Sequence, residues 1–217
     1  MKNKIIIVAG DPNSINSELI YKTWKKLNKK TKKRIYFIIN FNLFKSQLKK
    51  LKYKCYAIKV EDLNESINSN ALKIIDIPLK FKNSFNVSIF NSSNYVIKSL
   101  NLAHKLALKK DIKGLINCPI NKKLIKSSKK FGVTEFFASK CGIKDHTEIM
   151  MIYNKKLSVV PITTHIDLKD VSKKITPYLV KQKAISLNNN FKRLFKKKPK
   201  IGILGLNPHN AEFKNNS

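Results

Sequence analysis

The sequence predicts an α/β protein in which a mostly parallel sheet carries helices on both faces. Continuous β-branched segments, such as IIIVAG at 5–10 and RIYFIIN at 34–40, are typical of strands buried on both faces. Amphipathic segments such as 17–27 and 42–51 follow them and have the spacing of helices that cover a core. Because strands that alternate with crossover helices pair in parallel, the pattern favours one parallel sheet between two layers of helices.

The individual elements follow from the same patterns in chain order. Asn16 or Ser17 is expected to cap the first helix, because both side chains accept hydrogen bonds from backbone amides. Pro177 suits the first turn of the last helix, and residues 154–156 suit a hairpin turn. The expected strands are 5–10, 34–40, 55–60, 72–79, 114–122, two within 148–164, and 200–207; the expected helices are 17–27, 42–51, 93–110 and 176–195.

The positive charge raises one alternative function. The 217 residues carry a formal net charge of +32, which is typical of proteins that bind nucleic acids. Arg34 and Arg193 are the only arginines, whereas recognition of bases and phosphates favours the bidentate guanidinium. The lysines are also spread along the whole chain. We therefore expect a solvated lysine-rich surface without specific nucleic-acid binding, and a basic nucleic-acid-binding protein is the less favoured hypothesis.

The sequence also predicts a cytoplasmic protein without membrane contact. No apolar run approaches the roughly 20 residues that cross a bilayer, and the first apolar stretch is too short and too β-branched for a signal peptide. Cys55, Cys118 and Cys141 are widely spaced and form no Cys-x-x-Cys pair. This spacing argues against a disulfide framework or a structural zinc site, so we expect three small buried thiols.

Polar segments that follow the expected strands are the candidate sites. Open α/β sheets bind ligands at the carboxyl ends of their strands. No Gly-x-Gly-x-x-Gly motif or P-loop is present. Residues 14–17 offer hydroxyls and helix-start amides for a polar ligand, and Lys122 offers a cation for a phosphate or carboxylate. The four candidate segments are 9–18, 117–122, 163–168 and 205–210.

Two histidines lie at similar places in these segments. His165 and His209 each follow an expected strand by one or two residues. Imidazole is the commonest protein ligand for Zn²⁺ and similar ions, so the pair could share one metal and leave positions open for substrate. Alternatively, the two are unrelated histidines bonded to backbone groups, and spacing alone favours that interpretation.

Five segments resemble 4-hydroxythreonine-4-phosphate dehydrogenases, enzymes of pyridoxal phosphate biosynthesis, in order and approximate spacing. The resemblance spans the chain, and TTH together with GLNPH is its most specific part. It implies an architecture like that of isocitrate and isopropylmalate dehydrogenases, with two α/β/α lobes around a cleft, and a cytoplasmic homodimer. The five segments are GDPNSINSE, NCPINK, GVTEFF, MMIYNKKLSVVPITTHIDL and GLNPHNAE.

The resemblance also implies a reaction and some of its residues. The substrate is a phosphorylated amino acid, 4-phosphohydroxy-L-threonine, whose secondary alcohol is oxidised by NAD or NADP. The β-keto acid formed loses CO₂ and becomes 3-amino-2-oxopropyl phosphate, with a divalent ion (Zn, Mg or Co) as Lewis acid. By position, His165 and His209 match two of three metal ligands, and Thr134 matches a substrate-binding threonine. Other catalytic residues and the cofactor-binding residues stay unassigned.

The chain departs from the resembled pattern at three places. In the first turn, 13–17, it lacks the glycine that the family commonly has there, so backbone approach to a ligand is expected to differ. Val133 stands where the family usually has histidine before the threonine, which removes one polar substrate contact. Family members also continue well beyond GLNPH, where they carry the third metal histidine, most cofactor contacts and a strand that returns to the first lobe.

We therefore expect a first lobe at 1–125 and the start of a second at 126–217, both truncated. A sheet without its returning strand is expected to keep an exposed apolar edge. A catalytically incompetent remnant of the same family is the second hypothesis.

Overall fold

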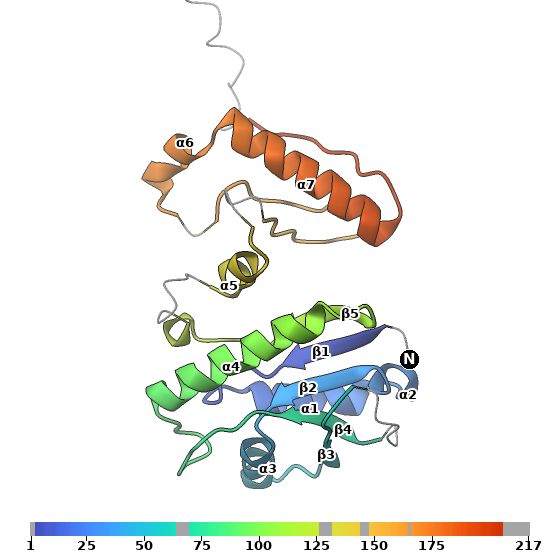
Figure 1. Ribbon diagram of the computed structural model, residues 1–217, viewed down its shortest axis with the longest axis vertical. Coiled ribbons are helices and arrows are strands. Elements are labelled where there is room, and N and C mark those ends of the chain that lie inside the picture. The colour runs from blue at the N-terminus through green and yellow to red at the C-terminus, as the bar shows by residue number, and fades with distance from the viewer. Residues whose placement is uncertain (1–2, 64–69, 126–131, 144–147, 165, 206–217) are drawn as a thin grey trace, which may run out of the picture. The chain divides into compact units, whose positions relative to one another are not determined.

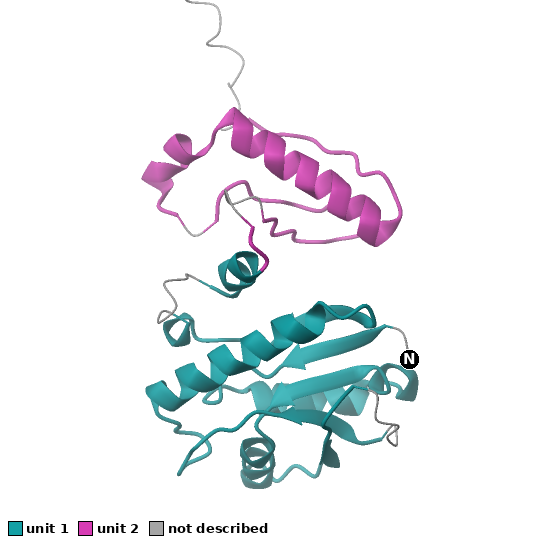
Figure 2. Ribbon diagram, viewed as in Figure 1, with its two compact units in different colours: residues 1–140 teal, residues 141–217 magenta. Residues whose placement is uncertain are grey.

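The computed structural model describes residues 3–63, 70–125, 132–143, 148–164 and 166–205 (Figure 1). The chain divides into two compact units, residues 1–140 (unit 1) and residues 141–217 (unit 2), which Figure 2 shows in different colours. The lobe boundary expected after residue 125 stays a prediction. Helix α5 (Val133–Lys140) groups with unit 1.

Unit 1 contains a parallel sheet, as the alternation of strands and helices predicted. Five strands within the described residues lie in the order β3-β4-β2-β1-β5, and every neighbouring pair is parallel. Strand β2 is buried along its whole length, which explains its uninterrupted apolar sequence. The strands are β1 (Lys4–Val8), β2 (Ile35–Ile39), β3 (Ala57–Lys59), β4 (Leu72–Asp76) and β5 (Ile112–Asn117).

Helices cover both faces of this sheet (Figure 1). Helices α1 (Asn16–Lys26) and α3 (Phe41–Lys50) cover one face, where Trp24 and Phe44 pack against the strands. Helix α4 (Ile89–Ala107) covers the other face through a stripe that includes Val96, Leu100 and Ala103. A short helix, α2 (Lys29–Lys32), precedes β2. The two hydrophobic clusters make unit 1 a three-layer structure with a core on each side of the sheet.

The helix starts show one wrong prediction. Helix α1 begins after Ile15, and neither Asn16 nor Ser17 caps it. Both side chains are buried and donate hydrogen bonds to other groups of unit 1. By contrast, Asn40 caps α3 by accepting from the Leu43 amide at 2.8 Å. A buried polar side chain at the start of a helix can therefore form tertiary hydrogen bonds instead of capping its own helix.

Strand β5 is an edge of the sheet within the described residues. It pairs with β1 on one side, and Leu115 packs under α4. Ile116, on the opposite face, is 52% exposed. The exposed apolar edge that was expected for a sheet without its returning strand stays a prediction.

Unit 2 is built around α7 (Pro177–Phe195), which the sequence predicted with Pro177 in its first turn. Thr176 caps this helix by accepting from the Leu179 amide at 3.1 Å. Two short helices precede it, η3 (Leu168–Asp170) and α6 (Val171–Lys174). Within the described ranges, every helix of the chain is too short or too polar to cross a bilayer.

The strands predicted for unit 2 were wrong over the described residues. The segment 148–164 forms a turn closed by a single antiparallel bridge, in which Ile152 and Val159 exchange amide hydrogen bonds at 2.9 and 3.0 Å. Residues 200–205 form no strand, and Leu204 there is 93% exposed. A strand needs a neighbour to bond with, and no described segment pairs with 200–205.

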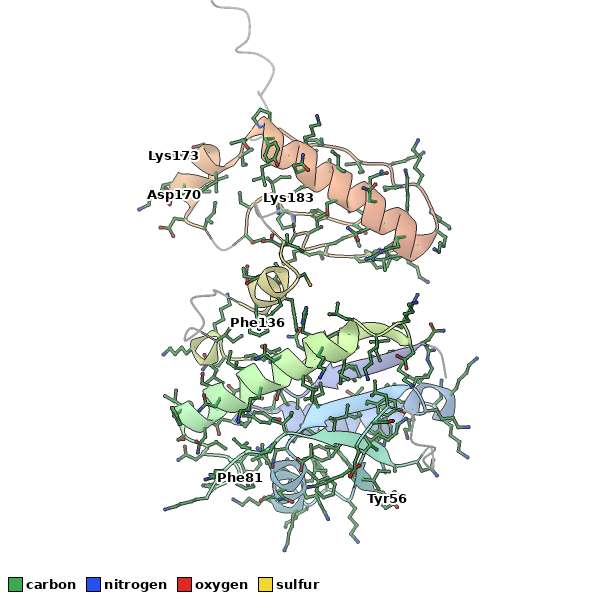
Figure 3. The ribbon with its side chains drawn as sticks, in the orientation of Figure 1. Tyr56, Phe81, Phe136, Asp170, Lys173 and Lys183 are labelled. Carbon is green, nitrogen blue, oxygen red and sulfur yellow. The ribbon has the colours of Figure 1, made fainter. Side chains whose placement is uncertain are left out.

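Lys183 on α7 is buried and is labelled in Figure 3. Its ammonium donates to the Glu148 carbonyl oxygen at 2.8 Å, and burial lowers the pKa of Lys183. No hydrophobic side chain among the described residues of unit 2 is fully buried. The described residues of unit 2 therefore form no core of the kind that stabilises unit 1.

Candidate functional site

The segments that follow β1 and β5 are locked together at the carboxyl end of the sheet. Gly10 has a φ of 74°, and a Cβ added there would lie 2.7 Å from the Pro119 carbonyl oxygen. The Asn16 side-chain amide donates to the carbonyl oxygens of Ala9 at 2.6 Å and Pro119 at 2.8 Å. Two of the four candidate segments, 9–18 and 117–122, thus form one structure.

Gln47 on α3 joins this structure to the connection between β4 and α4. Its side chain is 1% exposed. The side-chain nitrogen donates to the carbonyl oxygens of Pro12 at 2.8 Å and Ser84 at 2.6 Å. Its side-chain oxygen accepts from the Ser17 hydroxyl at 2.5 Å. Through these three hydrogen bonds, one buried amide connects α3 with segment 9–18 and with the connection between β4 and α4. The bonds fix the positions of both loops.

Asn13 adds a second connection between the same loops. Its side-chain nitrogen donates to the Val87 carbonyl oxygen at 2.8 Å, and its oxygen accepts from the Val87 amide at 2.7 Å. The Ser14 hydroxyl donates to the Asp11 carbonyl oxygen at 2.8 Å. The hydroxyls of Ser14 and Ser17, predicted as groups for a polar ligand, are thus bonded inside the protein.

One buried polar atom faces a small cavity in this network. Asn16 Oδ1 is buried and has no hydrogen-bond partner among the described residues. A cavity of about 10 Å³ lies beside Asn16, Gln47 and Tyr95. That volume matches one water, which needs about 10–15 Å³ and several polar partners. The small cavity has room for a water that satisfies Asn16 and has no room for a substrate.

Tyr95 of α4 lines both this small cavity and a larger one. Its hydroxyl accepts from the Asn40 amide at 3.1 Å, and burial raises the pKa of Tyr95 well above its usual range. Tyr95 therefore stays protonated at neutral pH and does not serve as a base. The larger cavity has a volume of about 200 Å³ and is lined by residues 78–80 and by Asn91, Asn94, Tyr95 and Lys98.

The three thiols are not alike, which corrects the expectation that all are buried. Cys118, at the end of β5, is buried, Cys55 is half-buried and Cys141 is exposed. Burial raises the pKa of Cys118 to about 11, and burial also raises the pKa of Cys55. A thiol with so high a pKa is a poor nucleophile at neutral pH, so Cys118 is a packing residue.

The predicted metal ligands, His165 and His209, lie outside the described residues. Among the residues that the structure describes, no three His, Cys, Asp or Glu side chains gather at a possible metal site. Thr134 is exposed in the first turn of α5, and Lys122 is exposed at the start of a short 3-10 helix, η1 (Lys122–Leu124). Val133 packs against the cluster under α4, which accounts for an apolar residue at this position.

The sequence did not predict the tertiary hydrogen bonds of three central residues of the network, Asn16, Gln47 and Tyr95. A usable signal exists for Gln47, which lies on the apolar stripe of α3 between Phe44 and Leu48. A polar residue on a buried stripe must find buried partners, because an unpaired amide is costly. The same argument applies to Tyr95 on the stripe of α4.

Comparison with known proteins establishes the family. A family model described as pyridoxal phosphate biosynthetic protein PdxA matches residues 12–214. The chain belongs to the PdxA family. The match includes Asn16 and residues 117–122 of the locked loops as well as Thr134, His165 and His209.

Similar PdxA proteins carry the name 4-hydroxythreonine-4-phosphate dehydrogenase. One from Sulfurihydrogenibium sp. (strain YO3AOP1) is 36% identical over 216 residues, which cover 96% of this chain and 64% of the relative. One from Aquifex aeolicus (strain VF5) is 35% identical over 217 residues, covering 98% of this chain and 65% of the relative. The chain therefore spans slightly less than two thirds of the length of these relatives.

Solved structures confirm the predicted α/β fold. A 4-hydroxythreonine-4-phosphate dehydrogenase from Burkholderia phymatum matches with a TM-score of 0.82 at 24% identity, covering 98% of this chain and 65% of that one. One from Klebsiella pneumoniae matches with a TM-score of 0.82 at 20% identity, covering 97% and 66%. The structural match covers residues of both unit 1 and unit 2 of this chain.

Proposed function

We propose that the chain contributes to the oxidation of 4-phosphohydroxy-L-threonine with NAD or NADP. The observation that carries this proposal is membership in the PdxA family over residues 12–214. The name of the 36% identical relative, 4-hydroxythreonine-4-phosphate dehydrogenase, supports this substrate. Because the chain spans 64% of that relative, the proposal concerns the part of the reaction that these residues perform.

The proposed reaction begins at the secondary alcohol of the substrate. The carbon-bound hydrogen leaves with its electron pair as hydride, the hydroxyl proton is released, and a ketone forms β to the carboxylate. The carboxylate then leaves as CO₂, its bonding electrons form an enolate, and protonation gives 3-amino-2-oxopropyl phosphate. When bound, the nicotinamide supplies the hydride acceptor. The product of the first step is a β-keto acid, which is why loss of CO₂ follows readily.

Three residues carry the proposed contacts. The exposed hydroxyl of Thr134, in the first turn of α5, orients the substrate by hydrogen bonding. His165 and His209 hold a divalent ion, and their imidazole donors suit Zn²⁺ and Co²⁺ better than Mg²⁺. An ion held there would supply Lewis acidity to both halves of the reaction. A homodimer and a cytoplasmic location belong to the same proposal.

Metal-dependent thermal stability tests the two histidines without requiring turnover. A ligand that binds only the folded state raises its melting temperature, so Zn²⁺ or Co²⁺ is expected to raise that of the chain. His165→Asn and His209→Asn are each expected to remove most of the increase. His104→Asn is the matched control, because His104 stacks on Phe137 at 6.4 Å within unit 1. An increase that survives in all three variants would place the ion elsewhere.

Turnover tests the reaction itself. NADH or NADPH formation is measured with 4-phosphohydroxy-L-threonine, each cofactor and each ion, in the presence of the third of a PdxA relative that this chain does not match. Cofactor reduction that depends on Thr134 and on both histidines supports the proposal. Absence of reduction under all these conditions argues against it.

A second candidate, a catalytically incompetent member of the PdxA family, is favoured by one observation. Among its described residues, unit 2, the part of the chain that contains both histidines, buries no hydrophobic side chain fully. This candidate predicts no metal-dependent increase in melting temperature. The thermal measurement therefore separates the two candidates before any turnover is sought.

A further inference from the structure

The cavity of about 200 Å³ in unit 1 has the size and position of a ligand site. It lies between the segment 78–80, which follows β4, and the first three turns of α4. Asn91 donates to the Lys80 carbonyl oxygen at 3.0 Å and so ties the two walls together. The volume far exceeds the 10–15 Å³ or so that one water requires. Carboxyl ends of parallel strands are also where α/β sheets bind their ligands.

The polar groups of this cavity are cations and amides. Lys80, Asn94 and Lys98 line it, and none of these side chains has a hydrogen bond or ion pair with another described residue. No carboxylate is among the lining residues. Asp76, at the end of β4, accepts from the Phe41 amide at 2.8 Å and pairs with Lys59 at 2.5 Å. The negative charge of Asp76 is therefore paired outside the cavity.

We propose that this cavity binds the phosphate group of a small molecule. Two ammonium groups and a carboxamide offer several donors to phosphate oxygens, and lysine binds phosphate as a point charge. Pro78 and Leu79 give the cavity an apolar wall, which suits the carbon chain of a phosphate monoester. Thr134 is not among the lining residues of the cavity, and the inference does not rest on the proposed dehydrogenase function.

Titration of the full chain, followed by ¹H–¹⁵N correlation spectra, tests this site. The probes are inorganic phosphate, O-phospho-L-serine and NAD⁺, with acetate as an anion without phosphate, all at one ionic strength. Saturable shifts are expected at the amides of residues 79–80 and 94–98. The probe that binds most tightly distinguishes free phosphate, a phosphate monoester and the pyrophosphate of a dinucleotide as the source.

Matched lysine variants separate the cavity from the general positive charge of the surface. Lys98→Gln is expected to weaken phosphate binding about tenfold, as loss of one charge-assisted hydrogen bond would. Lys80→Gln provides a second exposed test position in the cavity. Lys105→Gln is the control, because Lys105 is an exposed lysine on α4 outside the cavity. The phosphate affinity of this variant is expected to stay within about twofold of that of the parent chain.

Three outcomes would overturn the inference. Equal weakening by Lys98→Gln and Lys105→Gln would show only diffuse attraction to the lysine-rich surface. Acetate binding as tightly as phosphate at residues 79–80 would show a general anion effect. Shifts that never saturate, or that occur only at other parts of the chain, would show that the cavity is not a phosphate site.

Discussion

Replacement of Gly10 by alanine is expected to destabilise unit 1, because the backbone there has no space for a side chain. Gly10 has a φ of 74°, in the left-handed region that disfavours alanine. An added Cβ would lie 2.7 Å from the Pro119 carbonyl oxygen, 2.9 Å from Ile120 Cγ1 and 3.0 Å from the Cys118 carbonyl oxygen. Two of these neighbours are backbone atoms, so a side-chain rotation cannot relieve the contact.

The expected cost has two parts. A left-handed conformation costs a non-glycine residue roughly 1–2 kcal/mol. To relieve the short contacts, the loop after β1 must move away from residues 118–119, which weakens the Asn16 bond to Pro119. One net hydrogen bond contributes about 1 kcal/mol, so the sum is on the order of 2–3 kcal/mol. That sum is a large part of the 5–15 kcal/mol or so that stabilises a typical domain.

Urea unfolding followed by tryptophan fluorescence measures this cost in unit 1. Trp24 is the single tryptophan of the chain, is 4% exposed, and packs between α1 and the sheet. Gly114→Ala is the matched control, because a Cβ added at Gly114 meets nothing within 4 Å. That control is expected to match the parent or to gain about 0.5–1 kcal/mol from reduced chain entropy. If both alanine variants unfold at the same urea concentration, the close approach at Gly10 is refuted.

Three further predictions concern buried or exposed side chains of unit 1. Burial lowers the pKa of Lys73 from 10.5 to about 8, so the unfolded chain binds more protons between those values and stability rises with pH across this window. The rise is at most about 3 kcal/mol, and Lys73→Met should remove it in urea titrations from pH 7 to 10.5. Gln47→Leu leaves three buried partners unpaired and is expected to cost on the order of 2–4 kcal/mol by the same assay. Ile116→Lys is expected to change stability by less than about 0.5 kcal/mol while reducing light scattering, since the residue is 52% exposed on an edge strand.

The parallel sheet of unit 1 was predictable because the apolar composition of its strands indicates that they are buried. A strand such as β2, buried at every residue, must be apolar at every residue, and the sequence 35–39 has that form. The segment 200–205 has a similar composition, yet it forms no strand in the described part of the chain. Composition reports the tendency of one segment, whereas a strand also requires a neighbour with free amide and carbonyl groups.

The candidate site was predictable only in part, for a related reason. Segments 9–18 and 117–122 were predicted as candidate segments because they follow strands, and Asn16 joins the two. The use of that asparagine was not predictable, because a cap and a tertiary hydrogen bond employ the same side chain. His165 and His209 were singled out by their places after expected strands, the family resemblance matched them to metal ligands, and their geometry stays a prediction.

The contrast between the two units determines how a failed activity assay must be interpreted. Unit 1 has hydrophobic clusters on both faces of its sheet, so its loops are held whether or not anything binds them. Unit 2 has no fully buried hydrophobic side chain among its described residues, and Leu157, Leu168 and Leu204 are each more than 70% exposed. Apolar surface of this kind is normally covered, and PdxA relatives of the same fold have about half as much sequence again. A chain that gains stability from a metal ion but reduces no cofactor would bind the ion without completing the reaction. Loss of both responses would instead match the second candidate, a catalytically incompetent member of the PdxA family.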